Sequence, residues 1–493
     1  MPDAIGRLLA RRAFLRAMGL GAATLSAPRW TARAAAPARP NIVFILADDL
    51  GWGDPRCNNS ESKVPTPHMD RLAAQGVRFT DAHSGAAVCT PTRYGIVTGR
   101  YSWRTSLKRG VLNGYSAPLV EPGRATVASL LRAQGYRTGC VGKWHLGWDW
   151  ARKDPNRPAA EKNIDFAKPI ARGPLAVGFD YYFGISASLD MAPYVYVEND
   201  RVTRLPTAHQ EKWGIVRPGA KAPDFDFFEV LPTLTRKATG FLDEHAAHHA
   251  GRPFFLYFPL TAPHTPVVPA KAFTGRSQAG EYGDFVAQVD GAIGEIVQAL
   301  DRLGQADNTL LIVTSDNGSA NQPMTEYDHR PNGPWRGRKS TIWEGGHREP
   351  FLARWPGRIA AGTTSDELVG LMDLTATCAA VAGAQLPPDA AEDSHNILPA
   401  LLGEQRDRPI REALVHHSGD GMFAIRQGQW KLVLGRGSGG WDGKGQPSDP
   451  EGQLYDMRDD PAETTNLYER HPEVVARLTA LLEKYQRDSR SRP

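Results

Sequence analysis

Short hydrophobic segments recur along the chain, each about as long as a single strand. The first, Ile42–Leu46, has no polar position, which is typical of a strand buried on both faces of a sheet. Phe254–Phe258 and Thr309–Thr314 read the same way, and a further strand is expected at Tyr136–Val141. Strands buried on both faces belong to sheets covered by helices, so the intervening segments should contain helices.

Helix signals lie between these strands. Thr66 is a suitable N-cap, Pro67 a suitable first helical residue and Gly76 a stop. Thr126 and Gly135 bracket a second short helix. A third helix ends at Gly304 and keeps its apolar residues on one face: Val289, Ile293, Ile296, Leu300 and Leu303. The alternation of strands and helices predicts an α/β fold with a largely parallel sheet.

The pattern changes after about residue 385. Three short strands are predicted close together: Phe423–Arg426, Gln429–Leu434 and Gln453–Asp456. The Gly-rich segment Gly435–Gly452 is interpreted as a flexible loop between the last two, and a final helix begins at Pro472. We therefore expect a catalytic domain over residues 37–384 and a smaller α+β subdomain, with a short antiparallel sheet and a terminal helix, over residues 385–493.

Residues 1–36 resemble a removable export signal. Arg11-Arg12 precede a short Gly/Ala-rich apolar stretch, Ala17–Ala27, and Ala34-Ala35-Ala36 offers a cleavage site. Arg11-Arg12-x-Phe14-Leu15-Arg16 resembles the bacterial twin-arginine signal. We expect cleavage after Ala36, export by the twin-arginine machinery and a periplasmic or secreted product without a membrane anchor. A basic amphipathic helix is the alternative interpretation.

Removing that segment changes the charge of the protein. The chain carries +4 with neutral histidines, but residues 1–36 contribute +5, which leaves −1 for the rest. A near-neutral body gives no support for nucleic-acid binding. The sequence has no apolar run of the ~18 residues that a membrane span needs, and four cysteines among 493 residues exclude a small disulfide scaffold.

Two oxygen-rich pairs follow predicted strands directly. Asp48-Asp49 follows the first strand, and Asp316-Asn317 follows Thr309–Thr314. In open α/β sheets ligands bind beyond the carboxyl ends of the strands, so the two pairs can converge on one point. Three carboxylates and an amide oxygen suit Ca²⁺ or Mg²⁺. The alternative is that each pair caps the turn after its strand.

The segment most informative about possible chemistry is Cys89-Thr90-Pro91-Thr92-Arg93. Cys89 precedes a predicted helix, and a thiolate at a helix N-terminus beside Arg93 should have a lowered pKa. The residue is therefore either a candidate nucleophile or a buried structural thiol.

The sequence resembles the formylglycine-dependent type I sulfatases at this point. The signature Cys-x-Pro-x-Arg is present as Cys89, Pro91 and Arg93. Further family-like motifs follow in the expected order: Pro40–Asp49, Gly142–Gly147, Thr314–Gly318, Lys339–Pro350 and Leu454–Pro461. His347 departs from the family pattern, which has a small apolar residue there, and position 92 is Thr where many members have Ser. The resemblance implies an alkaline-phosphatase-like sandwich around a large, mostly parallel sheet.

The resemblance also implies a mechanism for sulfate ester hydrolysis. A formylglycine-generating enzyme oxidises the cysteine, here Cys89, to an aldehyde that hydrates to a geminal diol. One hydroxyl attacks the sulfur, the alcohol leaves, and the second hydroxyl expels inorganic sulfate and restores the aldehyde. The residues that match the family's calcium ligands are Asp48, Asp49, Asp316 and Asn317, with an oxygen of residue 89 completing the set.

The remaining catalytic roles follow from the same resemblance. Arg93 holds residue 89 and its hydroxyls, and Lys143 and Lys339 bind sulfate oxygens. His145 orients the diol and takes its proton, and His264 is the general acid for the leaving oxygen. Taken singly, the lysines read as surface charges and the histidines as structural residues.

A polar and aromatic segment supplies candidates for substrate binding. Ser188 matches a family loop that touches the site, and Asp190 and Tyr194 are candidates for contacts with sugar hydroxyls. Loop packing is the alternative for this segment. We expect a sulfated carbohydrate as the substrate, with a phosphodiester or phosphonate monoester hydrolase and an inactive sulfated-glycan binding protein as alternatives. The sequence lacks the G-x-S-x-G elbow of serine esterases.

Three cysteines remain once Cys89 is converted: Cys57, Cys140 and Cys378. An odd number leaves at least one unpaired, and Cys140, in a predicted buried strand, is the expected one.

Overall fold

The computed structural model describes residues 39–492. The predicted export signal and its cleavage site lie outside these residues. A ten-stranded sheet runs through this part of the chain in the order β13-β2-β12-β11-β1-β10-β4-β5-β6-β7. Its strands are β1 (Asn41–Asp48), β2 (Val77–Phe79), β4 (Arg137–Lys143), β5 (Tyr181–Ile185), β6 (Val197–Glu198), β7 (Arg201–Val202), β10 (Phe254–Pro263), β11 (Thr309–Ser315), β12 (Phe351–Arg354) and β13 (Thr363–Ser365).

The centre of the sheet is parallel, as the sequence predicts. β1 lies between β10 and β11 and is parallel to both, and β10, β4 and β5 continue in the same direction. β12 is antiparallel to β11 and β2, and β6 is antiparallel to β5 and β7. All eight residues of β1 are buried, so the sheet must be covered on both faces.

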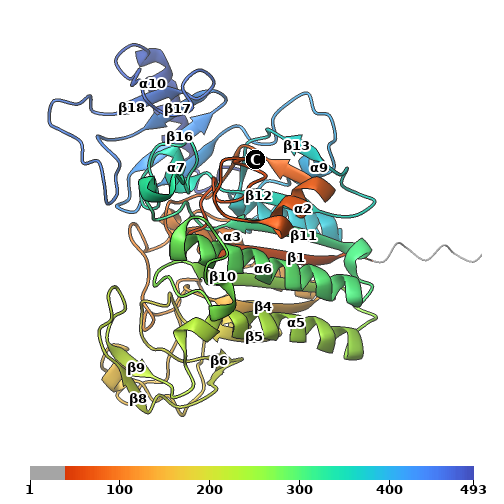
Figure 1. Ribbon diagram of the computed structural model, residues 1–493. Helices are drawn as coiled ribbons and strands as arrows, with labels where there is room; N and C mark the ends of the chain where they lie inside the picture. The colour runs from red at the N-terminus through yellow and green to blue at the C-terminus, as the bar shows by residue number, and fades with distance from the viewer. Residues whose placement is uncertain (1–38, 493) are drawn as a thin grey trace, which may run out of the picture. The chain divides into compact units, whose positions relative to one another are not determined.

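Two groups of helices supply this cover. α6 contacts both α2 and α5, and all three contact the sheet, whereas α3, α4 and α8 form a second group that reaches β4 through α4. The helices are α2 (Pro67–Gln75), α3 (Cys89–Thr98), α4 (Val127–Ala133), α5 (Val230–His248), α6 (Gly280–Arg302), α7 (Glu344–His347), α8 (Leu374–Ala382), α9 (Leu398–Leu401) and α10 (Pro472–Arg487). Figure 1 shows α5 and α6 lying along the strands β4 and β10. None of the helices in the described chain is long and apolar enough to cross a membrane.

The predicted local signals are largely found. Thr66 and Gly76 flank α2, and Thr126 caps α4 by accepting a hydrogen bond from the Ser129 N–H. β10 continues five residues beyond the expected Phe258, to Pro263, because its residues stay buried throughout.

The C-terminal segment forms a small antiparallel sheet with α10 packed on it. Its strands are β15 (Leu414–His417), β16 (Phe423–Gln427), β17 (Trp430–Val433) and β18 (Gln453–Asp456). The sequence pattern missed β15. Figure 1 shows β16, β17, β18 and α10 gathered at one end of the described chain. The boundary that we expect at residue 385 stays a prediction.

Two further sheets have two strands each within residues 39–492. They pair β3 (Ala82–His83) with β14 (Val369–Gly370), and β8 (Ala208–Gln210) with β9 (Gly219–Lys221). All four cysteines of the described chain are free thiols, including Cys140.

Candidate active site

The carboxyl ends of β1 and β11 bring the two oxygen-rich pairs together. The Asp49 backbone N–H donates to Asp316 Oδ1 over 3.2 Å. The Asn317 amide donates to Asp49 Oδ1 over 2.7 Å. These three side chains and that of Asp48 are at most 2% exposed. The four residues thus meet at the edge of the sheet where ligands bind in open α/β folds.

Each carboxylate of this group is paired with a buried base. The pairs are Asp48 with Lys143 at 2.7 Å, Asp49 with Lys339 at 2.7 Å and Asp316 with Arg93 at 2.8 Å. Burial raises the pKa of Asp48, but Lys143 and the other nearby cationic groups together hold that pKa well below its usual value. Burial lowers the pKa of Lys339, but Asp49 and the other nearby acidic groups together raise it above its usual value. Buried charges require such partners, since loss of one partner costs about 3–5 kcal/mol.

The position of Lys143 depends on a close contact between strands. Gly142 has φ +139°, and a Cβ at this position would lie 1.8 Å from the Pro259 carbonyl oxygen. Only glycine fits there, because the end of β4 passes directly against β10. Lys143 follows as the last residue of β4 and reaches Asp48.

The donor set fits a hard divalent cation. Asn317 Oδ1 is buried and accepts no hydrogen bond from any residue between 39 and 492. Burial, followed by the nearby Asp48, raises the pKa of Asp316 to about 6, which reflects crowded carboxylates that a cation would relieve. Carboxylate and amide oxygens are preferred ligands of Ca²⁺. Asp48, Asp49, Asp316 and Asn317 can therefore hold a calcium ion.

Cys89 is the first residue of α3, whose ten residues are all buried. Its Sγ lies 3.6 Å from Asp48 Oδ1 and 3.4 Å from Lys339 Nζ. The expectation of a lowered thiol pKa is wrong: burial, and then Asp316, raise the pKa of Cys89 above its usual value. Arg93 does not offset this, because its guanidinium donates to Asp316. The unmodified thiol is thus a poor nucleophile here.

Two histidines line the same cavity as Cys89. His145 has φ +56°, and its Nε2 lies 2.8 Å from the Leu112 carbonyl oxygen. Its Nδ1 is buried and has no partner in the described chain. His264 Nε2 lies 3.8 Å from Asp49 Oδ2. Burial, and then a neighbouring lysine, lower the pKa of both rings.

The cavity has a volume of about 530 Å³ and contains two of the three predicted substrate contacts. Ser188 and Asp190 line it, and both are nearly fully buried. Ser188 Oγ and Asp190 Oδ1 make no hydrogen bond within the part of the chain that the structure describes. Both atoms are therefore available to a bound molecule.

Tyr194 does not line this cavity, so the structure does not bring it together with the other two predicted substrate contacts. Its ring packs against Phe225 and Phe227, with centroids 5.9 and 5.1 Å away. Its hydroxyl donates to the Arg217 carbonyl oxygen over 2.6 Å. Tyr194 thus has the packing role that was the alternative for this segment.

The sequence analysis missed Trp441, which lines the cavity and is 56% exposed. It lies in the Gly-rich loop after β17. Asp442 next to it is held by Arg338, which contacts both carboxylate oxygens, and by Gln322 at 2.9 Å. Lys339 Nζ lies 5.9 Å from the Trp441 ring centre. A lone aromatic residue among glycines is the sequence signal that could have identified Trp441.

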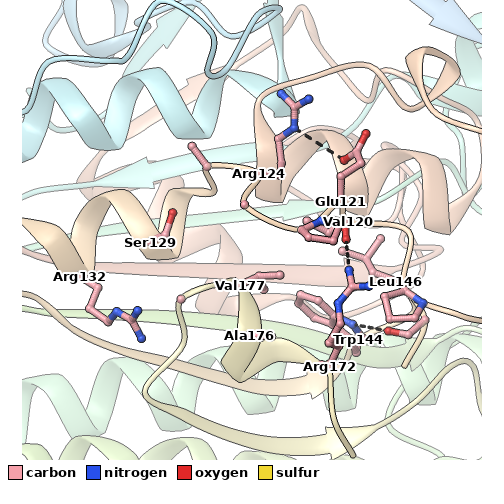
Figure 2. Close-up of a pocket in the computed structure, with 17 residues that line it drawn as sticks. Val120, Glu121, Arg124, Ser129, Arg132, Trp144, Leu146, Arg172, Ala176 and Val177 are labelled. Carbon is pink, nitrogen blue, oxygen red and sulfur yellow. Dashed lines mark hydrogen bonds and ion pairs between the residues drawn. The ribbon is translucent and has the colours of Figure 1, made fainter. Parts of the chain in front are cut away.

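A separate cavity of about 330 Å³ lies on the other side of the segment that holds His145 (Figure 2). Trp144 and Leu146 line it, whereas His145 lines the Cys89 cavity. The Trp144 indole donates to the Gly147 carbonyl oxygen over 3.2 Å, and Arg172 donates to that of Val120 over 2.9 Å. The first contact lies within the segment that holds His145, and the second joins two other segments that line this cavity.

Comparisons with known proteins agree with this site. The family model "Sulfatase" matches residues 40–384, and the model "N-sulphoglucosamine sulphohydrolase, C-terminal" matches residues 338–488. The chain is 36% identical to the N-acetylgalactosamine-6-O-sulfatase of Bacteroides thetaiotaomicron, over 90% of this chain and 93% of that protein. It is also 36% identical to the human N-acetylgalactosamine-6-sulfatase, over 83% of this chain and 74% of that protein.

A solved structure shares the fold. It comes from work on the metabolism of multiple glycosaminoglycans by Bacteroides thetaiotaomicron, and it superposes with a TM-score of 0.79. The sequences are 36% identical, and the match covers 90% of this chain and 99% of the other. With the buried oxygen cluster, Cys89 at the start of α3 and the family model over most of the chain, the protein belongs to the sulfatase family, whose members hydrolyse sulfate esters.

Proposed function

We propose that this sulfatase removes sulfate from a carbohydrate, with a 6-O-sulfated N-acetylhexosamine as the first substrate class to test. The observation that carries the proposal is the Cys89 cavity, which joins a floor of buried, paired acids and bases to a rim suited to a sugar. Two relatives named for N-acetylgalactosamine-6-sulfate support the choice of sugar.

The floor of the cavity supplies the chemistry in this proposal. Oxidation of Cys89 to formylglycine provides a hydrated aldehyde as the nucleophile, in place of a thiol whose pKa is raised by burial. Asp48, Asp49, Asp316 and Asn317 would hold a calcium ion, which would supply positive charge to offset the negative charge of the sulfate group. Lys143 and Lys339 bind sulfate oxygens, since a buried cation is a strong partner for an oxyanion in a site of low dielectric constant.

Two histidines move protons in the proposed reaction. His145 accepts a proton at the free Nδ1, because its Nε2 is committed to the Leu112 carbonyl oxygen. His264 donates a proton to the leaving oxygen. Burial, and then Lys339, lower the pKa of this ring, and Asp49 beside it partly offsets them. If this is correct, His264→Ala slows release of poor leaving groups far more than release of nitrophenol. Equal losses on both substrates would count against the acid role.

The rim of the cavity selects the sugar. The exposed indole of Trp441 offers a flat apolar face for a pyranose ring, as aromatic side chains do in many ligand sites. Ser188 and Asp190 offer free oxygen atoms for ring hydroxyls. Asp190→Ala tests this arrangement directly, because unchanged activity on sugar sulfates would show that Asp190 does not contact the sugar.

The central experiment measures sulfate release by ion chromatography. The protein is co-expressed with a formylglycine-generating enzyme and assayed on sulfated mono- and oligosaccharides, an aryl sulfate and matching phosphate esters, with Cys89→Ala as the control. Release from a sugar sulfate that the control lacks supports the proposal. Faster turnover of phosphate esters favours a phosphoryl hydrolase. Binding without turnover, with the aldehyde at residue 89 shown by peptide mass, favours a glycan-binding protein.

We also propose export by the twin-arginine route, with cleavage after Ala36. The sequence of residues 11–16 supports this, because paired arginines precede a short apolar stretch. Replacement of Arg11-Arg12 by two lysines should keep the protein in the cytoplasm. N-terminal sequencing of the exported form should begin at Pro37, and a start far from that residue would refute the cleavage site.

A further inference from the structure

Three buried histidines meet outside the cavity that contains Cys89. His83 ends β3, His347 ends α7 and His416 lies in β15, and each is fully buried. The ring centres of His347 and His416 are 3.9 Å apart, and that of His83 lies 5.2 and 5.1 Å from them. The proposed reaction uses none of these residues. His347 is also the position where the sequence departs from the family pattern.

Each of the three rings directs one nitrogen to an oxygen of the protein. The contacts are His83 Nε2 to Asp81 Oδ1 at 2.8 Å, His347 Nε2 to the Ile342 carbonyl at 3.0 Å, and His416 Nδ1 to the Ser84 carbonyl at 3.3 Å. An oxygen acceptor places the proton on the nitrogen that faces it, and the opposite nitrogen of a neutral ring then has a lone pair. Burial is the main cause of a lowered pKa in all three rings, which keeps them neutral.

The three remaining nitrogens lie close together. Nδ1 of His83 and Nδ1 of His347 are 3.1 Å apart, and His416 Nε2 has no hydrogen-bond partner among the described residues. One nitrogen from each ring lies within 4.8 Å of the other two. Lone pairs at such distances repel one another unless a cation or a proton lies between them. A tetrahedral zinc ion with Zn–N bonds of about 2.0–2.1 Å holds its ligand nitrogens roughly 3.3 Å apart.

We propose that His83, His347 and His416 form a second metal site, selective for a borderline divalent cation such as Zn²⁺. Imidazole nitrogen suits zinc, whereas the oxygen donors near Cys89 suit calcium, so the two sites differ in the metal they select. Glu344 Oε2 lies 4.0 Å from His83 Nδ1, but Arg348 already donates to it over 2.7 Å, so a water molecule is the expected fourth ligand. Asp81 behind His83 fixes the orientation of that ring, as carboxylates do behind metal-binding histidines.

Lys431 provides the competing arrangement. Its Nζ lies 3.0 Å from His347 Nε2, and donation there would move the His347 proton to Nδ1, facing His83. The cluster would then be a hydrogen-bonded chain that needs no metal. The nearly parallel stack of His347 on His416, with an interplanar angle of 13°, suits that chain, because a shared ion would turn one ring out of the stack. Zinc binding distinguishes the two arrangements.

The test uses the whole mature protein with calcium present throughout. Zinc content is measured by mass spectrometry after equilibrium dialysis against zinc, and Co²⁺ is added separately so that its visible absorption bands report the ligand geometry. We expect one zinc per chain and a tetrahedral Co²⁺ spectrum. Single His83→Gln, His347→Gln and His416→Gln variants should lose zinc affinity at least about tenfold, and Asp81→Asn about tenfold, while His471→Gln outside the cluster should bind as the wild type does.

Two results would overturn the proposal. One is a wild-type protein that binds no more zinc than the His83→Gln/His347→Gln double variant. The other is a Co²⁺ spectrum typical of an oxygen-liganded octahedral ion, which would place the bound metal elsewhere. The Co²⁺ spectrum needs only the wild type, so the test stands even if the variants fail to fold. Calcium-dependent sulfate release is measured in parallel and is independent of this result.

Discussion

The floor and the rim of the Cys89 cavity are built in opposite ways. At the floor, buried carboxylates are matched with buried bases, as Asp48 is with Lys143 and Asp316 with Arg93. At the rim, Trp441 and Ile215 are more than half exposed, and Asp190 keeps one oxygen unpartnered in the described structure. A change in the floor leaves a buried charge without its partner, whereas a change in the rim alters only what touches the substrate. Under the proposed function, the floor sets the reaction and the rim sets the substrate.

The largest expected effect comes from removing the nucleophile of the floor. Cys89→Ala should lower sulfate release by at least about 10⁴-fold, because no other group can form the covalent intermediate. The measurement is initial rate on the best sugar sulfate under matched protein content. Cys57→Ser, at a partly exposed thiol, is the control and should keep full activity. Residual activity above a hundredth of wild type in Cys89→Ala would mean that another residue is the nucleophile.

The next effect comes from the cation site. Asp316→Asn should weaken calcium binding and lower activity about 10²–10³-fold, since a metal ion contributes several kcal/mol to the stabilisation of charge. It should also lower the free energy of unfolding, because Arg93 loses a buried partner. Calcium affinity by calorimetry and thermal melting test both effects, with Asp307→Asn on an exposed turn as the control. Calcium binding at the wild-type affinity would exclude Asp316 as a ligand.

A smaller effect is expected at the rim. Trp441→Ala should raise KM for sugar sulfates about tenfold and leave kcat almost unchanged, because it removes contact area with the sugar but no group from the floor. Trp441→Phe should recover most of the loss. Tyr327→Ala, another exposed aromatic residue that does not line the cavity, should behave as the wild type does. A fall in kcat with KM unchanged would contradict the separation of floor from rim.

The smallest expected effect is on the pH dependence of stability and comes from a buried histidine. His417 in β15 is buried, and burial lowers its pKa from 6.5 to about 4. The unfolded chain binds more protons between these values, so stability is lost as the pH falls below the unfolded pKa. From pH of about 7 to about 5.5 the loss should be about 1 kcal/mol. Urea unfolding at both pH values should show less pH dependence for His417→Gln than for wild type.

The sequence predicted the floor better than the rim. Asp48, Asp49, Asp316 and Asn317 follow strands whose buried pattern is plain, and parallel strands bring their carboxyl ends to one edge. The rim depends on loops, and the position of a loop depends on distant contacts such as Arg338 with Asp442. Trp441 was therefore missed, and Tyr194 was assigned to the cavity although its ring is buried against Phe227.

The pKa of Cys89 shows a second limit. Local sequence places Arg93 near the thiol, but the fold directs that guanidinium to Asp316. The electrostatic environment of a buried group depends on residues far away in the chain, and spacing alone does not reveal them. β15 was missed because its sequence, Leu-Val-His-His, ends in two histidines, which do not indicate a buried strand, although all four residues are buried.

Under the proposed mechanism, the complete burial of α3 requires that Cys89 be oxidised before the chain folds. All ten residues of α3 are buried after folding, so a modifying enzyme could reach the cysteine only before the chain folds. Under the proposed mechanism, oxidation competes with folding while the nascent chain is still open, and a molecule that folds first is permanently inactive. The twin-arginine route carries proteins that are already folded, so the competition between oxidation and folding would take place in the cytoplasm. The active fraction of a preparation would then depend on how fast the chain folds.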